Sequence, residues 1–178
     1  MIFLTGVHGV GKTTLLSRIS KLHPIEIVTA SDLIKNAHGD VSNTKLVSDV
    51  DDNQKLLVEA VSAFRDEHGD RFILDGHCVL INDRGNYELL PIAVFADLAP
   101  SQIIVLTDDA RRICDRLRAR DGHASKESTI HQLQTIELFW SSEIAHMLGI
   151  QCNTVSQPVA DSKLADLLTI GQTNGRTF

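Results

Sequence analysis

Short apolar runs alternate along this chain with segments in which apolar residues recur every three or four positions. Short apolar runs are typical of buried strands, and the longer spacing is typical of helices with one buried face. A chain that alternates between the two patterns predicts βα units and a parallel sheet. We therefore expect an α/β fold, built as one domain over residues 1–170 and followed by a flexible tail at 171–178.

The expected elements follow one another along the whole chain. Strands are predicted at residues 1–5, 25–29, 71–75, 102–106 and 150–155. Helices are predicted at residues 11–21, 31–36, 51–68, 108–120, 125–148 and 160–170, with Ser31-Asp32 and Ser125 as caps. Residues 38–50 show no clear element, and residues 82–91 carry turn-forming residues that predict an irregular surface loop.

Composition narrows the range of partners. The chain has 178 residues, of which 43% are hydrophobic and 22% charged, and its net charge is −6. Since a mildly acidic protein does not attract nucleic acid or anionic membranes, we expect no DNA or membrane partner.

Cys78, Cys114 and Cys152 lack the spacing of a disulfide framework or a zinc site. The N-terminus lacks a signal-peptide pattern and no apolar stretch is long enough to span a membrane, so we expect a cytoplasmic protein.

A glycine-rich motif follows the first predicted strand and opens the first predicted helix. It reads G-x-x-x-x-G-K-T and comprises Gly6, Val7, His8, Gly9, Val10, Gly11, Lys12 and Thr13. This is the pattern of a P-loop, whose backbone N–H groups surround the phosphates of a nucleotide at a helix N-terminus. Lys12 would reach the β- and γ-phosphates, Thr13 would ligate Mg²⁺, and Thr14 would lie near the α-phosphate. The motif predicts ATP and Mg²⁺ as ligands, while His8 either contacts the γ-phosphate or points to solvent.

A second carboxylate is needed near a P-loop to hold Mg²⁺ or to orient the acceptor. Asp75 is the best candidate because it ends the third predicted strand, and strand C-termini face the ligand crevice of such sheets. Its alternative role is to cap the following turn. His77 either binds a phosphate or holds the loop. Asp32 follows the second strand and is either close to the acceptor or an ordinary helix cap.

These motifs resemble those of the archaeal-type adenylate kinases and of the nuclear adenylate kinase-like ribosome-assembly factors. The likeness rests on residues 5–14, on Asp75-Gly76-His77, and on residues 111–121 and 125–130, which are similar to a helix and a return helix flanking a short lid. The resemblance implies a three-layer α/β/α P-loop NTPase fold with a doubly wound sheet of five parallel strands. It also implies transfer of the γ-phosphoryl group of ATP–Mg²⁺ to a nucleoside monophosphate. By position, residues 30–68 would bind the acceptor and residues 120–126 would form the lid.

The sequence departs from these kinases in its supply of arginine. Such kinases surround the transferring phosphoryl group with several arginines, whereas residues 121–125 contain none. Lys35 stands where an arginine would bind an acceptor phosphate, and Arg84 would have to substitute from its loop. Arg116 and Arg120 lie one helical turn apart and either cover the nucleotide or form a solvated face. We assign Arg120, which is nearest to the lid, to charge stabilisation.

Three functions are compatible with these features. The first is a nucleoside monophosphate kinase in which Lys12, Asp75 and Arg120 are catalytic. The second is a small-molecule kinase with a non-nucleotide acceptor, which the shortage of arginine favours because a neutral acceptor needs less positive charge. The third is an ATPase switch that acts on a protein or RNA partner.

Overall fold

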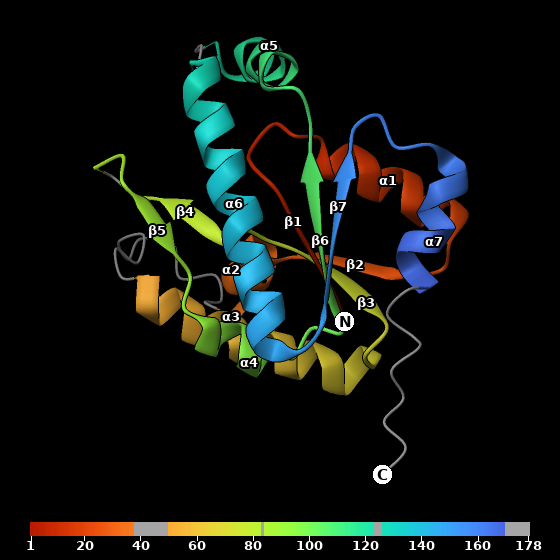
Figure 1. Cartoon of the computed structure of the whole chain (residues 1–178). Helices are drawn as coiled ribbons and strands as arrows, with labels where there is room; N and C mark the ends of the chain where they lie inside the picture. Colours follow the sequence, from red (N-terminus) through yellow and green to blue (C-terminus); the bar gives the residue numbers. More distant parts are fainter. Residues whose placement is uncertain (38–49, 83, 123–125, 170–178) are drawn as a thin grey trace.

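A five-stranded parallel sheet forms the centre of the protein, whose computed structural model describes residues 1–37, 50–82, 84–122 and 126–169. Its strands are β1 (Ile2–Thr5), β2 (Glu26–Thr29), β3 (Phe72–Asp75), β6 (Gln102–Thr107) and β7 (Gln151–Ser156). Their spatial order is β2-β3-β1-β6-β7, and each neighbouring pair is parallel (Figure 1). The inner strands β1, β3 and β6 are buried almost throughout, as expected of parallel strands covered on both faces.

Helices cover both faces of this sheet. They are α1 (Lys12–Leu22), α2 (Ala30–Ala37), α3 (Val50–His68), α4 (Ile92–Leu98), α5 (Ala110–Asp121), α6 (Glu127–Leu148) and α7 (Leu164–Thr169), with a 3-10 turn at Asp161–Lys163. Figure 1 shows α1 and α7 on one side of the sheet and α6 on the other. The three-layer α/β/α fold and the five parallel strands expected from the sequence are therefore confirmed.

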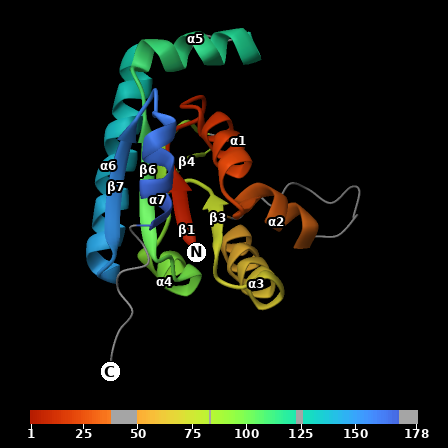
Figure 2. The same ribbon diagram turned by 90° about the vertical axis from the view of Figure 1, so that its right-hand side faces the viewer.

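The chain order places a crevice at the end of the central strand. From β1 the chain passes to β2 and β3 on one side and then to β6 and β7 on the other, so that β1 lies between β3 and β6 (Figure 2). Ligands of such sheets bind beyond the carboxyl ends of the strands at the point where the order reverses. Leu4 of β1 lies beside Asp75 of β3, so the end of β3 reaches the segment that follows β1.

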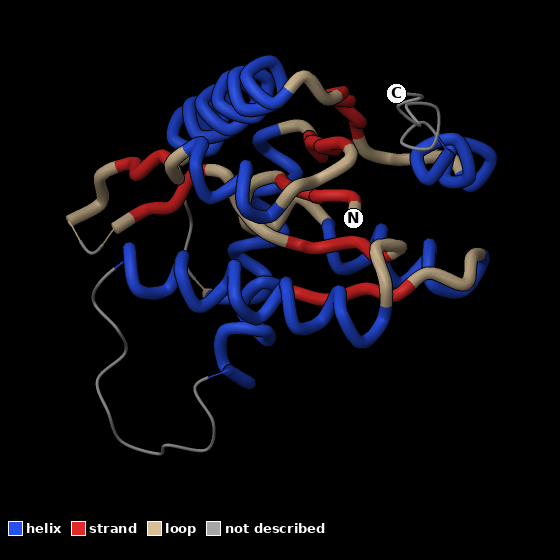
Figure 3. Tube along the Cα trace, turned by 90° about the horizontal axis from the view of Figure 1, so that it is seen from below, coloured by secondary structure: helices blue, strands red, loops and turns tan. Residues whose placement is uncertain are grey.

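Residues 82–91 differ from the loop expected there. β4 (Val79–Ile81) and β5 (Tyr87–Leu89) form an antiparallel hairpin, which is followed by the unpredicted helix α4. The hairpin projects at one end of the molecule (Figure 3). The turn residues at its tip were recognised from the sequence, but the apolar positions on either side of them are too few to show strand periodicity.

One helix start differs from its expected cap, and another has a cap that the sequence analysis did not predict. Ser31-Asp32 does not begin α2, because the helix starts at Ala30 and the Thr29 hydroxyl accepts a hydrogen bond from the Asp32 N–H at 3.1 Å. Helix α5 begins at Ala110, and the Asp109 carboxylate caps it by accepting from the Arg112 N–H at 3.1 Å. Ser125, expected to cap the next helix, lies outside the described residues, as do residues 38–49 and the expected tail.

Aromatic contacts join the sheet to the helices that cover it. The ring of Phe3 in β1 meets that of Phe95 in α4 edge-on, with centroids 5.2 Å apart, and Phe64 of α3 meets Phe72 of β3 at 5.0 Å. A Cβ on Gly76 would lie 2.8 Å from the Phe3 ring, so the residue after Asp75 has no room for a side chain.

The three cysteines are free, with Cys78 and Cys114 buried. Within the described ranges, no helix is long and apolar enough to cross a lipid bilayer.

Candidate functional site

The loop after β1 presents its backbone at the start of α1. Gly6 has φ +144°, and a Cβ on it would lie 2.5 Å from the carbonyl oxygen of Leu106 in β6. Only glycine fits where the loop passes this closely to the neighbouring strand. Gly11 then precedes the first turn of α1, whose free N–H groups and dipole attract an anion. The loop therefore has the geometry of a phosphate-binding cradle.

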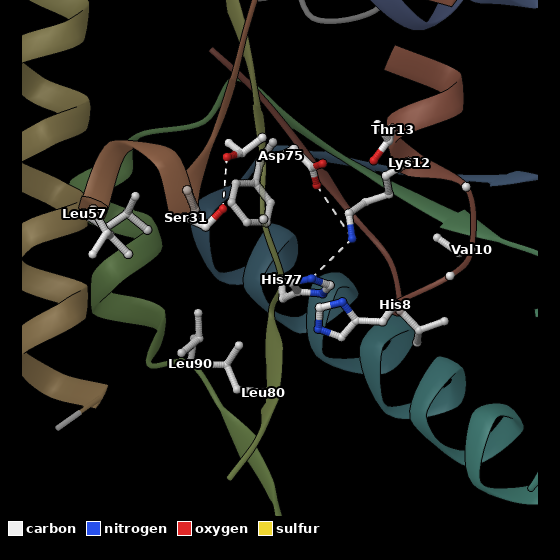
Figure 4. A pocket seen from close by; sticks show the side chains of 18 of the residues that line it. His8, Val10, Lys12, Thr13, Ser31, Leu57, Asp75, His77, Leu80 and Leu90 are labelled. Atoms are coloured by element: carbon white, nitrogen blue, oxygen red, sulfur yellow. Dashed lines mark hydrogen bonds and ion pairs between the residues drawn. The ribbon is translucent and has the colours of Figure 1, made fainter. Parts of the chain in front are cut away.

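Lys12 lies at the centre of the site rather than in solvent. Its side chain is only 9% exposed, and its ammonium donates to the Gly6 carbonyl oxygen at 2.8 Å. The same nitrogen lies 3.6 Å from Asp75 Oδ1 and 3.4 Å from His77 Nε2 (Figure 4). Burial lowers the pKa of Lys12, although Asp75 opposes the shift. The structure thus brings the lysine of the loop together with two residues that the sequence singled out.

Asp75 ends β3 and faces the ammonium of Lys12. Burial raises the pKa of Asp75 and outweighs the opposite effect of Lys12. A carboxylate with a raised pKa is a better proton acceptor than an ordinary aspartate. Asp75 and Thr13 both line the cavity, so a carboxylate and a hydroxyl group are present there as possible ligands of a cation. The placement of Asp75 is compatible with either of the roles that a P-loop protein requires.

Two histidine rings lie against each other beside the lysine. The His8 and His77 ring centroids are 4.3 Å apart. Burial, followed by the charge of Lys12, lowers the pKa of His77 to about 2, so its imidazole is neutral at physiological pH. The Nε2 of His77 near Lys12 is therefore available as an uncharged hydrogen-bonding group.

A cavity of about 640 Å³ connects the loop to a second region. Its phosphate half is lined by Val7, His8, Gly9, Val10, Gly11, Lys12, Thr13, Thr14, Arg116, Leu117 and Arg120. Its distal half is lined by Thr29, Ala30, Ser31, Ile34, Asn53, Gln54, Leu57, Leu80, Leu90 and Val94. Asp75 and His77 lie between the two halves (Figure 4). A cavity of this size accommodates small ligands, and here it extends from the phosphate-binding loop to a separate apolar region.

Helix α5 contributes two arginines to the phosphate half. Arg116 donates to the carbonyl oxygen of Gly9 at 2.7 Å and to Asp108 Oδ2 at 2.6 Å. Burial acts to raise the pKa of Asp108, but hydrogen bonds from Arg112 and Arg116 outweigh it and hold that pKa below its ordinary value. Arg116 therefore links the loop to a buried carboxylate, whereas the sequence analysis considered only a nucleotide contact or a solvated helix face. Arg120 is more exposed and pairs with Asp121 at 2.7 Å.

Replacing Arg116 with alanine should weaken ATP binding about tenfold, because the Gly9 carbonyl loses a charge-assisted hydrogen bond. Titration calorimetry with an ATP analogue would measure the change. Arg112→Ala is the matched control: Arg112 also binds Asp108, at 2.8 Å through Nε, but in the part of the chain that the structure describes it makes no hydrogen bond with the loop. Equal losses of affinity in both variants would contradict the role of Arg116 in holding the loop.

Three residues proposed from the sequence to bind the acceptor lie outside the cavity lining. Asp32 and Lys35 pair with each other 3.8 Å apart on the exposed face of α2, and Lys35 is 76% exposed. Arg84 is exposed in the turn of the β4–β5 hairpin. Of the expected acceptor region 30–68, α2 and α3 line the distal half through other residues. In the expected lid, residues 123–125 lie outside the described residues.

Sequence reasoning missed Glu137, a buried glutamate in the middle of α6. It is 1% exposed, and its carboxylate accepts hydrogen bonds from the Thr5 hydroxyl, the Cys78 N–H at 2.9 Å and the Val79 N–H at 3.1 Å. These contacts join the end of β1 to the segment after His77. Burial raises the pKa of Glu137, while the hydrogen bonds oppose that shift. Its signal in the sequence is a glutamate at helical spacing among the apolar positions 130, 133 and 144.

Glu137→Ala should destabilise the protein by about 3 kcal/mol or more, since three buried donors lose their acceptor and each costs about 1 kcal/mol or more when left unpaired. Urea denaturation followed by circular dichroism would measure the free energy of unfolding. Glu137→Gln, which keeps one acceptor oxygen, should lose less. Glu143→Ala, on the exposed face of the same helix, provides the control and should change stability by less than about 0.5 kcal/mol.

Together, the sheet order, the glycine-rich loop and the lysine at its end define a P-loop nucleotide-binding domain. A family model described as an AAA domain matches residues 5–136. The chain therefore belongs to the AAA domain family. The match covers the loop, Asp75, His77 and the α5 arginines, and it ends one residue before Glu137.

Solved structures share this fold at low sequence identity. The tunicamycin resistance protein of Deinococcus radiodurans is similar with a TM-score of 0.60 and 14% identity, over 94% of this chain and 92% of that one. A sugar kinase from Janibacter sp. has a TM-score of 0.51 and 15% identity, over 94% of this chain and 91% of that one. An uncharacterized protein from Eubacterium ventriosum has a TM-score of 0.52 and 11% identity, over 94% and 95%. At such identities the likeness shows the fold alone. No curated protein matches the sequence.

Proposed function

We propose that this protein is an ATP-dependent phosphotransferase that moves the γ-phosphoryl group of ATP–Mg²⁺ to a hydroxyl group of a small-molecule acceptor. The observation that carries the proposal is the position of Lys12 and Asp75. They face each other 3.6 Å apart in a cavity that runs from the phosphate-binding loop to a separate distal half. A simple nucleotide-binding site would not need the second region, whereas a kinase needs room for both substrates.

The residues present fit a nucleotide with its metal ion. Gly9, Gly11 and Lys12 line the cavity at the start of α1, where backbone N–H groups can surround a phosphate group. Thr13 lines the cavity at the first turn of α1, and Asp75 supplies a carboxylate between its two halves. A hydroxyl and a carboxylate are the oxygen ligands that Mg²⁺ prefers. When bound, the ion would neutralise phosphate charge and help to orient the transferring group.

The side chains have separate roles in the transfer. The acceptor hydroxyl oxygen attacks the γ-phosphorus, the bond from that phosphorus to the bridging oxygen breaks, and ADP leaves with the electron pair. The proton of the acceptor hydroxyl passes to the carboxylate of Asp75. Lys12 stabilises the charge that develops on the phosphate oxygens, and Arg120 adds positive charge from α5. Arg116 holds the loop, and neutral His77 positions the Lys12 ammonium or the acceptor.

The acceptor that the site supports best carries no phosphate, in contrast to the nucleoside monophosphate implied by the resemblance. The cations that line the cavity are Lys12, Arg116 and Arg120, and all three belong to its phosphate half. Among the described residues of the distal half there is no lysine or arginine. An acceptor phosphate would need such a partner, because burying an unpaired anion is costly. The shortage of arginine noted in the sequence thus extends to the described part of the acceptor site.

A coupled assay of ADP release tests the proposal. ATP–Mg²⁺ would be supplied with nucleoside monophosphates, nucleosides, sugars and simple alcohols in turn, and the phosphorylated product would be identified by mass spectrometry. We expect at least one hydroxyl acceptor to raise ADP release well above the acceptor-free rate and to appear as its phosphate ester. Acceptor-independent hydrolysis alone would overturn the kinase assignment and favour an ATPase switch that acts on a protein or RNA partner.

A further inference from the structure

The distal half of the cavity is predominantly apolar. Aliphatic side chains reach it from α2, α3, β4, α4 and the segment that leads into α4. These side chains are Ile34, Leu57, Leu80, Leu90 and Val94. Figure 4 shows Leu57, Leu80 and Leu90 around the space that lies beyond His77 from the phosphate-binding loop. An apolar surface that lines a cavity is suited to an apolar ligand.

These side chains are not all ordinary core residues. Leu57 and Leu90 are 6% and 7% exposed, while Ile34 and Leu80 are only half-buried. They belong to elements far apart in the sequence and converge on one space that continues to Asp75. When a ligand covers half-buried aliphatic groups, the free energy falls because apolar surface is removed from water. This surface therefore favours an apolar ligand.

The polar residues that line this half are Thr29, Ser31, Asn53 and Gln54, and all four are uncharged. The hydroxyl oxygens of Thr29 and Ser31 lie 3.1 Å apart, close to the end of β2. Gln54 of α3 is 9% exposed and contributes an amide. Neutral hydroxyl and amide groups recognise the orientation of an uncharged ligand, and they do not compensate a buried charge.

We propose that the acceptor is an uncharged amphiphilic alcohol. Its apolar body lies against Ile34, Leu57, Leu80 and Leu90, and its hydroxyl group points toward Asp75. This inference rests on the proposed function, because it names the class of acceptor for the same transfer. It excludes acceptors that are polar over their whole surface, such as free sugars, as well as phosphorylated ones.

A homologous series of primary n-alkanols from ethanol to hexanol provides the probe. Each is offered with ATP–Mg²⁺, and kcat/KM for alkyl phosphate formation is measured. We expect kcat/KM to rise about fourfold for each added methylene group, which corresponds to the free energy of burying one CH₂. Glycerol, ribose and AMP, offered under the same conditions, should give less product than hexanol.

Two neighbouring residues of β4 supply a matched pair of variants. Leu80 lines the cavity, whereas Ile81 is 49% exposed and points to the opposite face of the strand. Leu80→Asn should reduce the gain per methylene to about twofold or less, since the chain would then lie against an amide. Ile81→Asn should leave the gain unchanged. The KM for ATP should be the same in both variants.

The outcomes separate the inference from the function on which it rests. A rising series that Leu80→Asn flattens and Ile81→Asn does not supports both. A flat series, together with rapid transfer to AMP, ribose or glycerol, overturns the amphiphilic acceptor and leaves the phosphotransferase intact. A rising series that Leu80→Asn leaves unchanged overturns the placement of the apolar body in this half. Absence of transfer to every acceptor overturns the proposed function and the inference with it.

Discussion

Replacing Lys12 with alanine should lower the rate of ADP release by roughly 10²–10³-fold, the loss expected when one donor to a developing oxyanion is removed. Lys12 pairs with Asp75: its ammonium lies 3.6 Å from that carboxylate and 2.8 Å from the Gly6 carbonyl oxygen. No other described side chain of the loop can replace its charge. The coupled assay at saturating ATP and acceptor would measure the loss.

The same variant should remain folded, because it removes a buried cation and leaves the apolar core unchanged. Circular dichroism and the midpoint of thermal unfolding would establish this. Lys21→Ala is the control, since Lys21 is exposed in the last turn of the same helix, and it should retain full turnover. A folded Lys12→Ala protein with normal turnover would exclude the lysine from the chemistry.

Asp75→Asn should reduce turnover by roughly 10²–10⁴-fold, the contribution typical of a positioned general base. An amide keeps the shape of the side chain but cannot take the proton of the acceptor. The affinity for the nucleotide should change only a few-fold, because the loop backbone supplies most of its contacts. Asp97→Asn, at an exposed position of α4, is the control. Loss of ATP binding with normal turnover at saturation would contradict this role for Asp75.

The pH dependence of the wild-type protein follows from the same carboxylate. Burial raises the pKa of Asp75, so the proton-accepting form is lost on acidification at a higher pH than for an ordinary aspartate. The acid limb of kcat/KM for ATP–Mg²⁺, which reports the free enzyme, should therefore have its midpoint above the usual aspartate range. The pKa of His77, about 2, keeps that histidine from adding a second limb at neutral pH. The limb should disappear in Asp75→Asn and remain in Asp97→Asn.

The fold was predictable because its strands are short runs of apolar residues buried on both faces. Ile2–Thr5 and Phe72–Asp75 differ from their expected bounds by only a single residue. The P-loop was predictable because the spacing of its glycines and lysine is typical of a phosphate-binding loop. Asp75 and His77 could be proposed because they follow a strand, and the ends of parallel strands meet at one edge of the sheet.

The rest depends on contacts between segments that local patterns do not relate. The partners of Glu137 lie at Thr5, Cys78 and Val79, 58 or more positions away along the chain. Its place among the apolar positions of α6 shows that it is buried but not what it binds. Asp32 and Lys35 were proposed from their sequence positions, yet α2 directs them to its exposed face. The apolar character of the distal half likewise arises only when α2, α3, β4, α4 and the segment before α4 converge.

The close approach of Gly6 to Leu106 also has a consequence for the order in which the protein is assembled. The nucleotide motif is complete within the first 13 residues, but the strand that it packs against is β6. This strand pairs with β1 across about a hundred positions of the chain. Pairings of this range are slow to form, because a long loop must close before they contribute. A nascent chain that ends before residue 102 contains every residue of the motif but no residue of β6. The ability to hold a phosphate group thus arises late in synthesis, although its residues are made first.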